Sequence, residues 1–199
     1  MIKSIFAGFM IALVAGIYLV VEAPLGAFMF SLGLLTILYF KANLFTGKAG
    51  LLTTKDISFK DLSLIWVGNF IGCIICALLF SFTTLGSVFN IEASRILMIR
   101  VNNLWFENII LGIFCGIFMY IGVRSYVNYP YITILCVASF ILLGTNHCVA
   151  DMAYLLLANN KELFFAGFLT ILETTLGNII GTNLIPLITI YTDDCCSDN

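Results

Sequence analysis

One polar segment interrupts an apolar part of the chain and contains its only histidine. Residues 142–152 read LLGTNHCVADM, so His147 follows a glycine at Gly144 and precedes Asp151 by four positions. The ordinary pKa of histidine lies near physiological pH, which suits it to donate a proton or to present positive charge. A histidine inside a membrane is costly and therefore points to function, with a purely structural hydrogen bond as the alternative.

Asp151 and Asn146 are the candidate partners of His147. If a helix begins at residue 147, Asp151 lies on the same helical face, because side chains four residues apart are neighbours. We therefore hypothesise that Asp151 is the acidic partner of the imidazole. A helix that starts after the break at Gly144 would also direct the positive end of its dipole toward this segment, where it would attract an anion.

The composition indicates an integral membrane protein. Hydrophobic residues make up 61% of the chain and charged residues only 10%, which is far from the balance of a soluble domain. Because a spanning helix needs about 20 apolar residues, the chain has room for about six spans. We expect one transmembrane domain over residues 1–199, with spans near 4–21, 24–43, 60–82, 105–124, 130–158 and 161–190. A cleaved signal peptide at the N-terminus is the alternative for the first span.

Lysine and arginine residues predict the orientation through the positive-inside rule. With the N-terminus inside, the outer side receives only Arg95, Arg100 and Lys161 of the nine basic residues. We therefore predict a multi-pass protein of the cell (plasma or inner) membrane with both termini in the cytoplasm. The net charge of −2 gives no reason to expect a nucleic-acid partner.

An internal repeat divides the chain into two halves. The sequence GNFIG at 68–72 returns as GNIIG at 177–181, and each copy closes a set of three spans whose middle span is broken, at 44–47 and at 144–147. Because the first half crosses the membrane three times, the second half enters the membrane from the opposite side. We therefore predict an all-α fold of two inverted three-helix repeats, at about 1–90 and about 100–190.

Small residues four positions apart recur in the unbroken spans and predict close helix packing. They are Gly8, Ala12 and Gly16; Gly68 and Gly72; Gly112 and Gly116; and Gly177 and Gly181. Asn69 and Asn178 follow two of these glycines, and we expect them to form hydrogen bonds between helices. The cysteines within the spans are interpreted as small buried apolar residues, so neither a metal nor a cofactor is expected.

Four segments resemble, in order and spacing, the motifs of the formate/nitrite transporter (FNT) family of pentameric anion channels. They are NLFTGKAG, WVGNFIGC, GTNHCVADM and TTLGNIIGTNLIP, and the resemblance runs from about residue 7 to residue 190. It implies an aquaporin-like six-helix fold, a homopentamer and a pore through each protomer.

The resemblance also implies roles for particular residues. Thr46 would face His147 across the centre of the pore. Phe30 and Phe140 would form the outer hydrophobic constriction, and Leu34 and Phe45 the inner one. Asn178 would be the polar pathway residue of the sixth span. Taken alone, these phenylalanines read as ordinary core or lipid-facing residues.

The chain departs from the family pattern beside the histidine. The family usually has glutamate immediately before the histidine and asparagine four residues after it, whereas Asn146 and Asp151 stand here. Arg100 is the candidate for the outer lysine of the family. We predict that Arg95 and Arg100 attract anions to the outer vestibule, with interfacial anchoring as the alternative.

These features together predict a channel or proton-coupled transporter rather than an enzyme, with proton exchange or electrostatic help at His147. A bare anion would lose its hydration in an apolar constriction at great cost, whereas a neutral weak acid passes more easily. The expected substrates are small monovalent weak-acid anions: formate, nitrite, hydrosulfide or a short carboxylate. The chain has none of the common catalytic motifs. An aquaporin-like pore for neutral solutes and a non-conducting scaffold subunit of the same fold are the alternatives.

Overall fold

The structure is a computed structural model that describes the backbone of residues 1–197 and the side chains of residues 1–191. The described residues form nine helices and no strands. The helices are α1 (Ile2–Val20), α2 (Leu25–Tyr39), α3 (Phe45–Ala49), α4 (Phe59–Ser81), α5 (Leu85–Asn102), α6 (Trp105–Ser125), α7 (Pro130–Leu142), α8 (Cys148–Ala158) and α9 (Lys161–Ser197).

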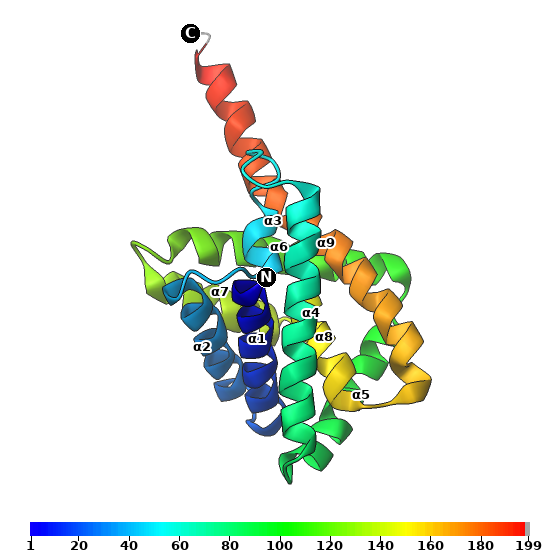
Figure 1. Ribbon diagram of the computed structural model, residues 1–199. Helices are drawn as coiled ribbons and strands as arrows, with labels where there is room; N and C mark the ends of the chain where they lie inside the picture. The colour runs from blue at the N-terminus through cyan, green and yellow to red at the C-terminus, as the bar shows by residue number, and fades with distance from the viewer. Residues whose placement is uncertain (198–199) are drawn as a thin grey trace.

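Four helices are long and apolar enough to cross a membrane: α1, α4, α6 and the Lys161–Tyr191 part of α9. Helices α2, α7 and α8 are apolar but shorter. In Figure 1, α1 and α4 run side by side, and the last part of α9 projects beyond the other helices. The four long helices occupy four of the six predicted spans, and the two broken spans are each divided into two helices.

The first break lies earlier than predicted. Residues 40–44 are not helical, whereas Thr46 and Gly47 already belong to α3. The physical reason is a left-handed backbone at Lys41, with φ of 50°, which ends the preceding helix. The second break, at residues 143–147, follows the prediction more closely and contains Gly144 with φ of 75°.

Helix α5 was not predicted at all. Its buried residues Phe89, Ala93 and Leu97 recur every four positions and form a single stripe, and the helix packs against α8. Charged and polar residues, among them Glu92, Arg95 and Arg100, recur between its apolar residues, so the helix does not have the continuous apolar run that reveals a membrane span. The four-residue spacing of the stripe was the available signal.

Glycines bring the long helices together in two similar pairs, α1 with α4 and α6 with α9. A methyl group added at Gly72 would collide with the carbonyl oxygen of Ile5, and one added at Gly181 would collide with that of Ile113. Such contacts between backbones need residues without a side chain. The small residues of the predicted repeat therefore lie where two helices touch.

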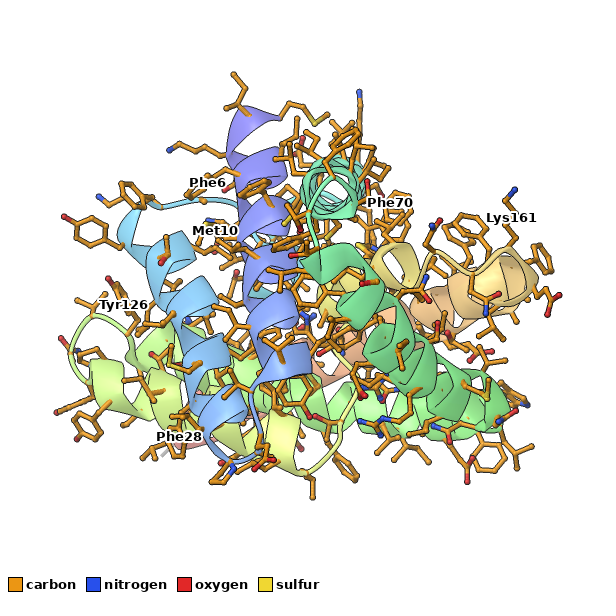
Figure 2. The ribbon with its side chains drawn as sticks, turned by 90° about the horizontal axis from the view of Figure 1, so that it is seen from below. Phe6, Met10, Phe28, Phe70, Tyr126 and Lys161 are labelled. Carbon is orange, nitrogen blue, oxygen red and sulfur yellow. The ribbon has the colours of Figure 1, made fainter. Side chains whose placement is uncertain are left out.

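The outer surface of the molecule is strongly apolar. Figure 2 shows the apolar side chain of Phe28 at the periphery of the bundle, where the charged side chain of Lys161 also lies. Large exposed side chains on the long helices include Leu78, Leu79 and Phe114. A continuous apolar exterior of this kind suits contact with lipid or with another subunit, and together with the apolar helices it indicates a membrane protein.

We expect the substitutions Gly72→Ala and Gly181→Ala each to lower the free energy of unfolding by about 1–3 kcal/mol, because the added methyl group overpacks a backbone contact. Gly47→Ala is the matched control, since its nearest neighbour would be a Val123 methyl group at 3.5 Å, an ordinary contact. Thermal unfolding in detergent measures the difference. A Gly72→Ala protein that melts like the wild type would contradict the interpretation.

Candidate functional site

The two breaks meet in the interior of the molecule. The hydroxyl oxygen of Thr46, in α3, lies 2.9 Å from Nε2 of His147, which immediately precedes α8. Both side chains are buried. The structure therefore places together two residues that are 101 positions apart in the sequence.

The second nitrogen of His147 caps helix α8. Nδ1 accepts a hydrogen bond of 3.1 Å from the backbone N–H of Ala150. A ring nitrogen that accepts a hydrogen bond carries no proton, so the proton of the neutral ring is on Nε2. The geometry therefore makes His147 a donor to the hydroxyl oxygen of Thr46 and leaves neither ring nitrogen free.

Asn178 holds the second break in place. Its carbonyl oxygen accepts from the N–H of Cys148 at 2.9 Å, and its amide group donates to the carbonyls of Asn146 and Gly112 at 2.9 and 2.8 Å. The side chain is fully buried. The role of Asn178 as a pathway residue stays a prediction. In the structure, its side-chain oxygen and its side-chain nitrogen are both hydrogen-bonded to backbone groups.

Asn69 makes the same set of hydrogen bonds at the first break. Its carbonyl oxygen accepts from the N–H of Phe45 at 2.8 Å, and its amide donates to the carbonyls of Ser4 and Asn43 at 2.7 and 2.9 Å. In both cases one asparagine connects a long helix, a broken segment and the start of a short helix. These contacts satisfy backbone groups that would otherwise be unpaired in an apolar interior.

Phe30 and Phe140 lie together beside the histidine. Their ring centroids are 6.5 Å apart in an edge-to-face arrangement, and the ring of Phe140 stacks on His147 with centroids 5.7 Å apart. A cavity of about 190 Å³ is lined by both phenylalanines and reaches His147. Leu34 and Phe45, the predicted inner constriction, are buried in the hydrophobic core on α2 and at the start of α3.

The expected pairing of Asp151 with His147 is wrong in this structure. Oδ1 of Asp151 lies 2.9 Å from Nε of Arg100, while both ring nitrogens of His147 have other partners. The prediction assumed that residue 147 is helical. Instead His147 has extended backbone angles, with φ of −114° and ψ of 112°, so the four-residue neighbour rule does not apply to it.

Asn146 also turns away from the histidine. Its amide donates to the side-chain oxygen of Asn108 on α6 at 2.9 Å, and the amide of Asn108 donates to Glu173 on α9 at 2.8 Å. Sequence reasoning missed Asn108 and its part in this network. The signal was weak, because an asparagine near the start of a span also reads as an ordinary polar boundary residue.

Arg95 and Arg100 both line the cavity that reaches His147. Arg100 also donates to the carbonyls of Thr145 and Gly144, at 3.2 and 3.5 Å, so it connects α5 to the segment that precedes the histidine. Arg95 is exposed and forms an ion pair of 3.0 Å with Glu92. The predicted vestibule arginines thus share a cavity, but each has a carboxylate partner.

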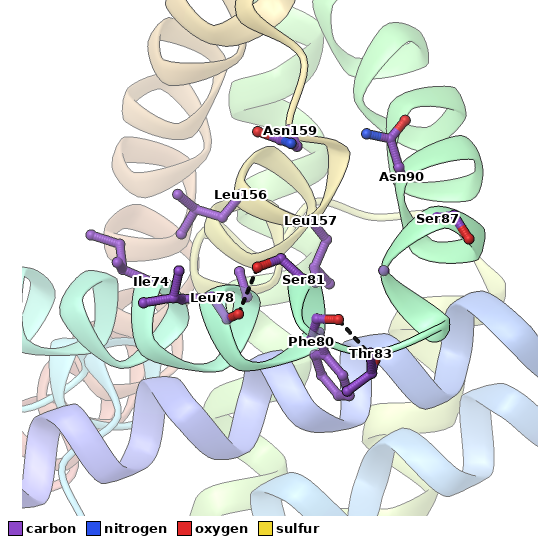
Figure 3. A pocket seen from close by; sticks show the side chains of 12 residues that line it. Ile74, Leu78, Phe80, Ser81, Thr83, Ser87, Asn90, Leu156, Leu157 and Asn159 are labelled. Carbon is purple, nitrogen blue, oxygen red and sulfur yellow. Dashed lines mark hydrogen bonds between the residues drawn. The ribbon is translucent and has the colours of Figure 1, made fainter.

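A larger groove lies elsewhere, between the end of α4, the start of α5 and the end of α8 (Figure 3). Its volume is about 690 Å³, and Leu78, Ser87 and Asn159 are among its lining residues. None of the residues that line it is a predicted site residue. The smaller cavity at His147 therefore remains the candidate functional site.

Comparisons with known proteins agree with this architecture. A family model described as Formate/nitrite transporter matches residues 1–192. A curated relative, "Formate channel FocA" of Haemophilus influenzae, is 25% identical over 145 residues, which is 64% of this chain and 51% of the relative. The chain thus spans about half the length of that relative.

Two solved structures share the fold. One, described as "Pentameric formate channel with formate bound", superposes with a TM-score of 0.80 at 22% identity and covers 98% of this chain and 96% of its own. The other, described as "FNT family ion channel", gives a TM-score of 0.75 at 21% identity, with 96% and 87% covered.

We expect Asn178→Ala to lower the free energy of unfolding by at least about 2 kcal/mol, because three buried backbone groups lose their partner. Asn178→Asp keeps the acceptor for Cys148 but loses both donors, so it should also be destabilised. Asn128→Ala, in an exposed turn, is the control. Thermal unfolding in detergent distinguishes the three, and equal melting of Asn178→Ala and Asn128→Ala would refute the assigned role.

Proposed function

The chain belongs to the formate/nitrite transporter family, and we propose that it is a membrane channel or transporter for small monovalent weak-acid anions such as formate, nitrite, hydrosulfide or a short carboxylate. The observation that carries the proposal is the buried contact between Thr46 and His147 at the inner end of a cavity bordered by Phe30 and Phe140. The named relatives are a formate channel and structures described as channels, which supports transport rather than catalysis.

The apolar rings favour a neutral form of the substrate. Phe30 and Phe140 offer no hydrogen-bond donor to replace the hydration of an anion, and desolvation of an unpaired charge is very costly. A protonated weak acid carries no net charge and crosses the same constriction at a far lower cost. Leu34 and Phe45 would repeat this selection on the inner side.

His147 would assist in one of two ways. In the observed geometry its Nε2–H is donated to Thr46, so the neutral ring could donate a hydrogen bond to an arriving anion only if that anion replaces the hydroxyl group of Thr46 as acceptor. A doubly protonated ring has two donors and no acceptor. Proton exchange would therefore require the ring to release the N–H of Ala150.

We also propose the arrangement of the protein in the membrane. Six crossings would be formed by α1, α2 with α3, α4, α6, α7 with α8, and α9, in two inverted repeats at about 1–90 and about 100–190. The matching hydrogen bonds of Asn69 and Asn178 support this repeat. Similarity to a pentameric channel supports a homopentamer, and the basic residues favour a cell membrane with both termini in the cytoplasm.

The decisive test is uptake of radiolabelled formate into proteoliposomes between about pH 5 and 8, a range over which the protonated fraction of a weak acid falls as the pH rises. We expect wild-type uptake to be saturable and pH-dependent. His147→Ala should reduce the rate by about tenfold or more and flatten the pH profile, because it removes the group that exchanges or positions a proton.

Thr46→Ser is the control for this experiment, because it keeps a hydroxyl group opposite His147. Nitrite and hydrosulfide salts, tested by liposome swelling, rank the substrates. A His147→Ala protein with the wild-type rate and pH profile would contradict the role of the histidine. Wild-type liposomes no more permeable than empty ones would favour a non-conducting scaffold.

We expect Phe30→Ala to increase passage of a permanently charged anion such as chloride, since it opens the outer apolar constriction. Phe89→Ala is the matched control: Phe89 is equally buried and also packs edge-to-face on another phenylalanine, Phe80, but it does not line the cavity. Chloride flux from proteoliposomes measures the change. A larger flux in the Phe89→Ala protein than in Phe30→Ala would rule out this assignment of the constriction.

A further inference from the structure

Both arginines at the cavity have a carboxylate partner, so the cavity does not present two unbalanced positive charges. Arg95 pairs with Glu92 at 3.0 Å, and Arg100 pairs with Asp151 at 2.9 Å. Arginine keeps its charge at any physiological pH. The carboxylates therefore decide how much positive potential an arriving anion encounters.

The two ion pairs differ in their contact with water. The side chains of Arg95 and Glu92 are 64% and 38% exposed, whereas those of Arg100 and Asp151 are 13% and 2% exposed. Water and salt screen the first pair. They screen the second much less, because the effective dielectric constant falls in the interior. A change in the charge of Asp151 should therefore be felt strongly at the cavity, and a change in Glu92 weakly.

Arg100 is placed to act on the histidine segment. Its terminal nitrogens donate to the carbonyls of Thr145 and Gly144, while its Nε faces Asp151 in the first turn of α8. Thr145, Gly144, Arg100 and His147 all line the same cavity. The guanidinium group is thus a permanent charge fixed against the segment that leads to the histidine.

We propose that Asp151 is a specificity-determining residue, which sets the affinity of the cavity for its anion by compensating the charge of Arg100. This inference rests on the proposed transport function. A poorly screened cation without a carboxylate partner would hold an anion tightly, whereas conduction requires binding that is weak enough to permit release. Compensation by Asp151 keeps the affinity of the cavity for the anion low and the release of the anion fast.

The proposal predicts an order of half-saturation concentrations for formate uptake at fixed pH. Asp151→Asn leaves Arg100 uncompensated, so its half-saturation concentration should fall by roughly threefold to tenfold, with a lower maximal rate. Arg100→Gln leaves the carboxylate uncompensated, so the concentration should rise. Arg100→Gln with Asp151→Asn removes both charges and should return the concentration toward the wild-type value.

Glu92→Gln is the matched control, because it removes a carboxylate from the exposed ion pair and should leave the half-saturation concentration within about twofold of wild type. A merely structural role for Asp151 would lower the amount of folded protein without lowering the half-saturation concentration. If Asp151→Asn does not fold, the comparison of Arg100→Gln with the double variant is decisive. Neutralising Asp151 must still lower the half-saturation concentration for formate when Arg100 is already glutamine.

The proposal is overturned if wild-type protein transports formate and neutralising Asp151 leaves the half-saturation concentration unchanged or raises it. It is also overturned if Glu92→Gln has an effect as large as Asp151→Asn. Absence of formate transport by the wild-type protein would instead remove the proposed function on which the inference rests, so the two failures are distinguishable.

Discussion

The architecture depends on the need to satisfy backbone hydrogen-bonding groups at two helix breaks inside an apolar protein. Neither lipid nor a hydrophobic core offers partners to free N–H and C=O groups, each of which costs several kcal/mol when unpaired. Asn69 and Asn178 supply those partners at the two breaks. Each also donates to a carbonyl of a neighbouring long helix, at Ser4 or Gly112, and close glycine packing makes that reach possible.

The position of His147 follows from the same constraint. Because the chain is extended at residue 147, the ring can fold back to cap α8 through Nδ1 and still offer Nε2 to Thr46. Phe140, on the helix before the break, then stacks on the ring. The break thus holds a polar ring between the ring of Phe140 and the hydroxyl group of Thr46, which is the arrangement that the proposed path for weak acids needs.

The sequence revealed the elements more readily than their contacts. Continuous hydropathy located α1, α4, α6 and α9, and clustered polar residues located the two breaks approximately. The proximity of Thr46 and His147 came from family resemblance, since no spacing rule connects residues 101 positions apart. Helix α5 was not predicted because Glu92, Arg95 and Arg100 interrupt its apolar residues, so hydropathy alone shows no continuous apolar run there. Asp151 was assigned to the wrong partner because the capping conformation of His147 depends on Asn178 and Ala150, which only the folded chain brings together.

The buried ion pair is hard to explain by stability alone. Removing two charges from water costs several kcal/mol per ion, and a well-packed apolar pair is often at least as stable. Arg100 nevertheless lines the histidine cavity, with Asp151 paired to it. Helix α5, which carries Arg100, also packs against α8, and it buries Phe89, Ala93 and Leu97 and donates a hydrogen bond from Asn90 to the carbonyl of Ala158. A further apolar contact would have served to attach α5. Paired charge beside this cavity is what the proposed role of Asp151 requires, whereas reinforcement of the fold does not need it.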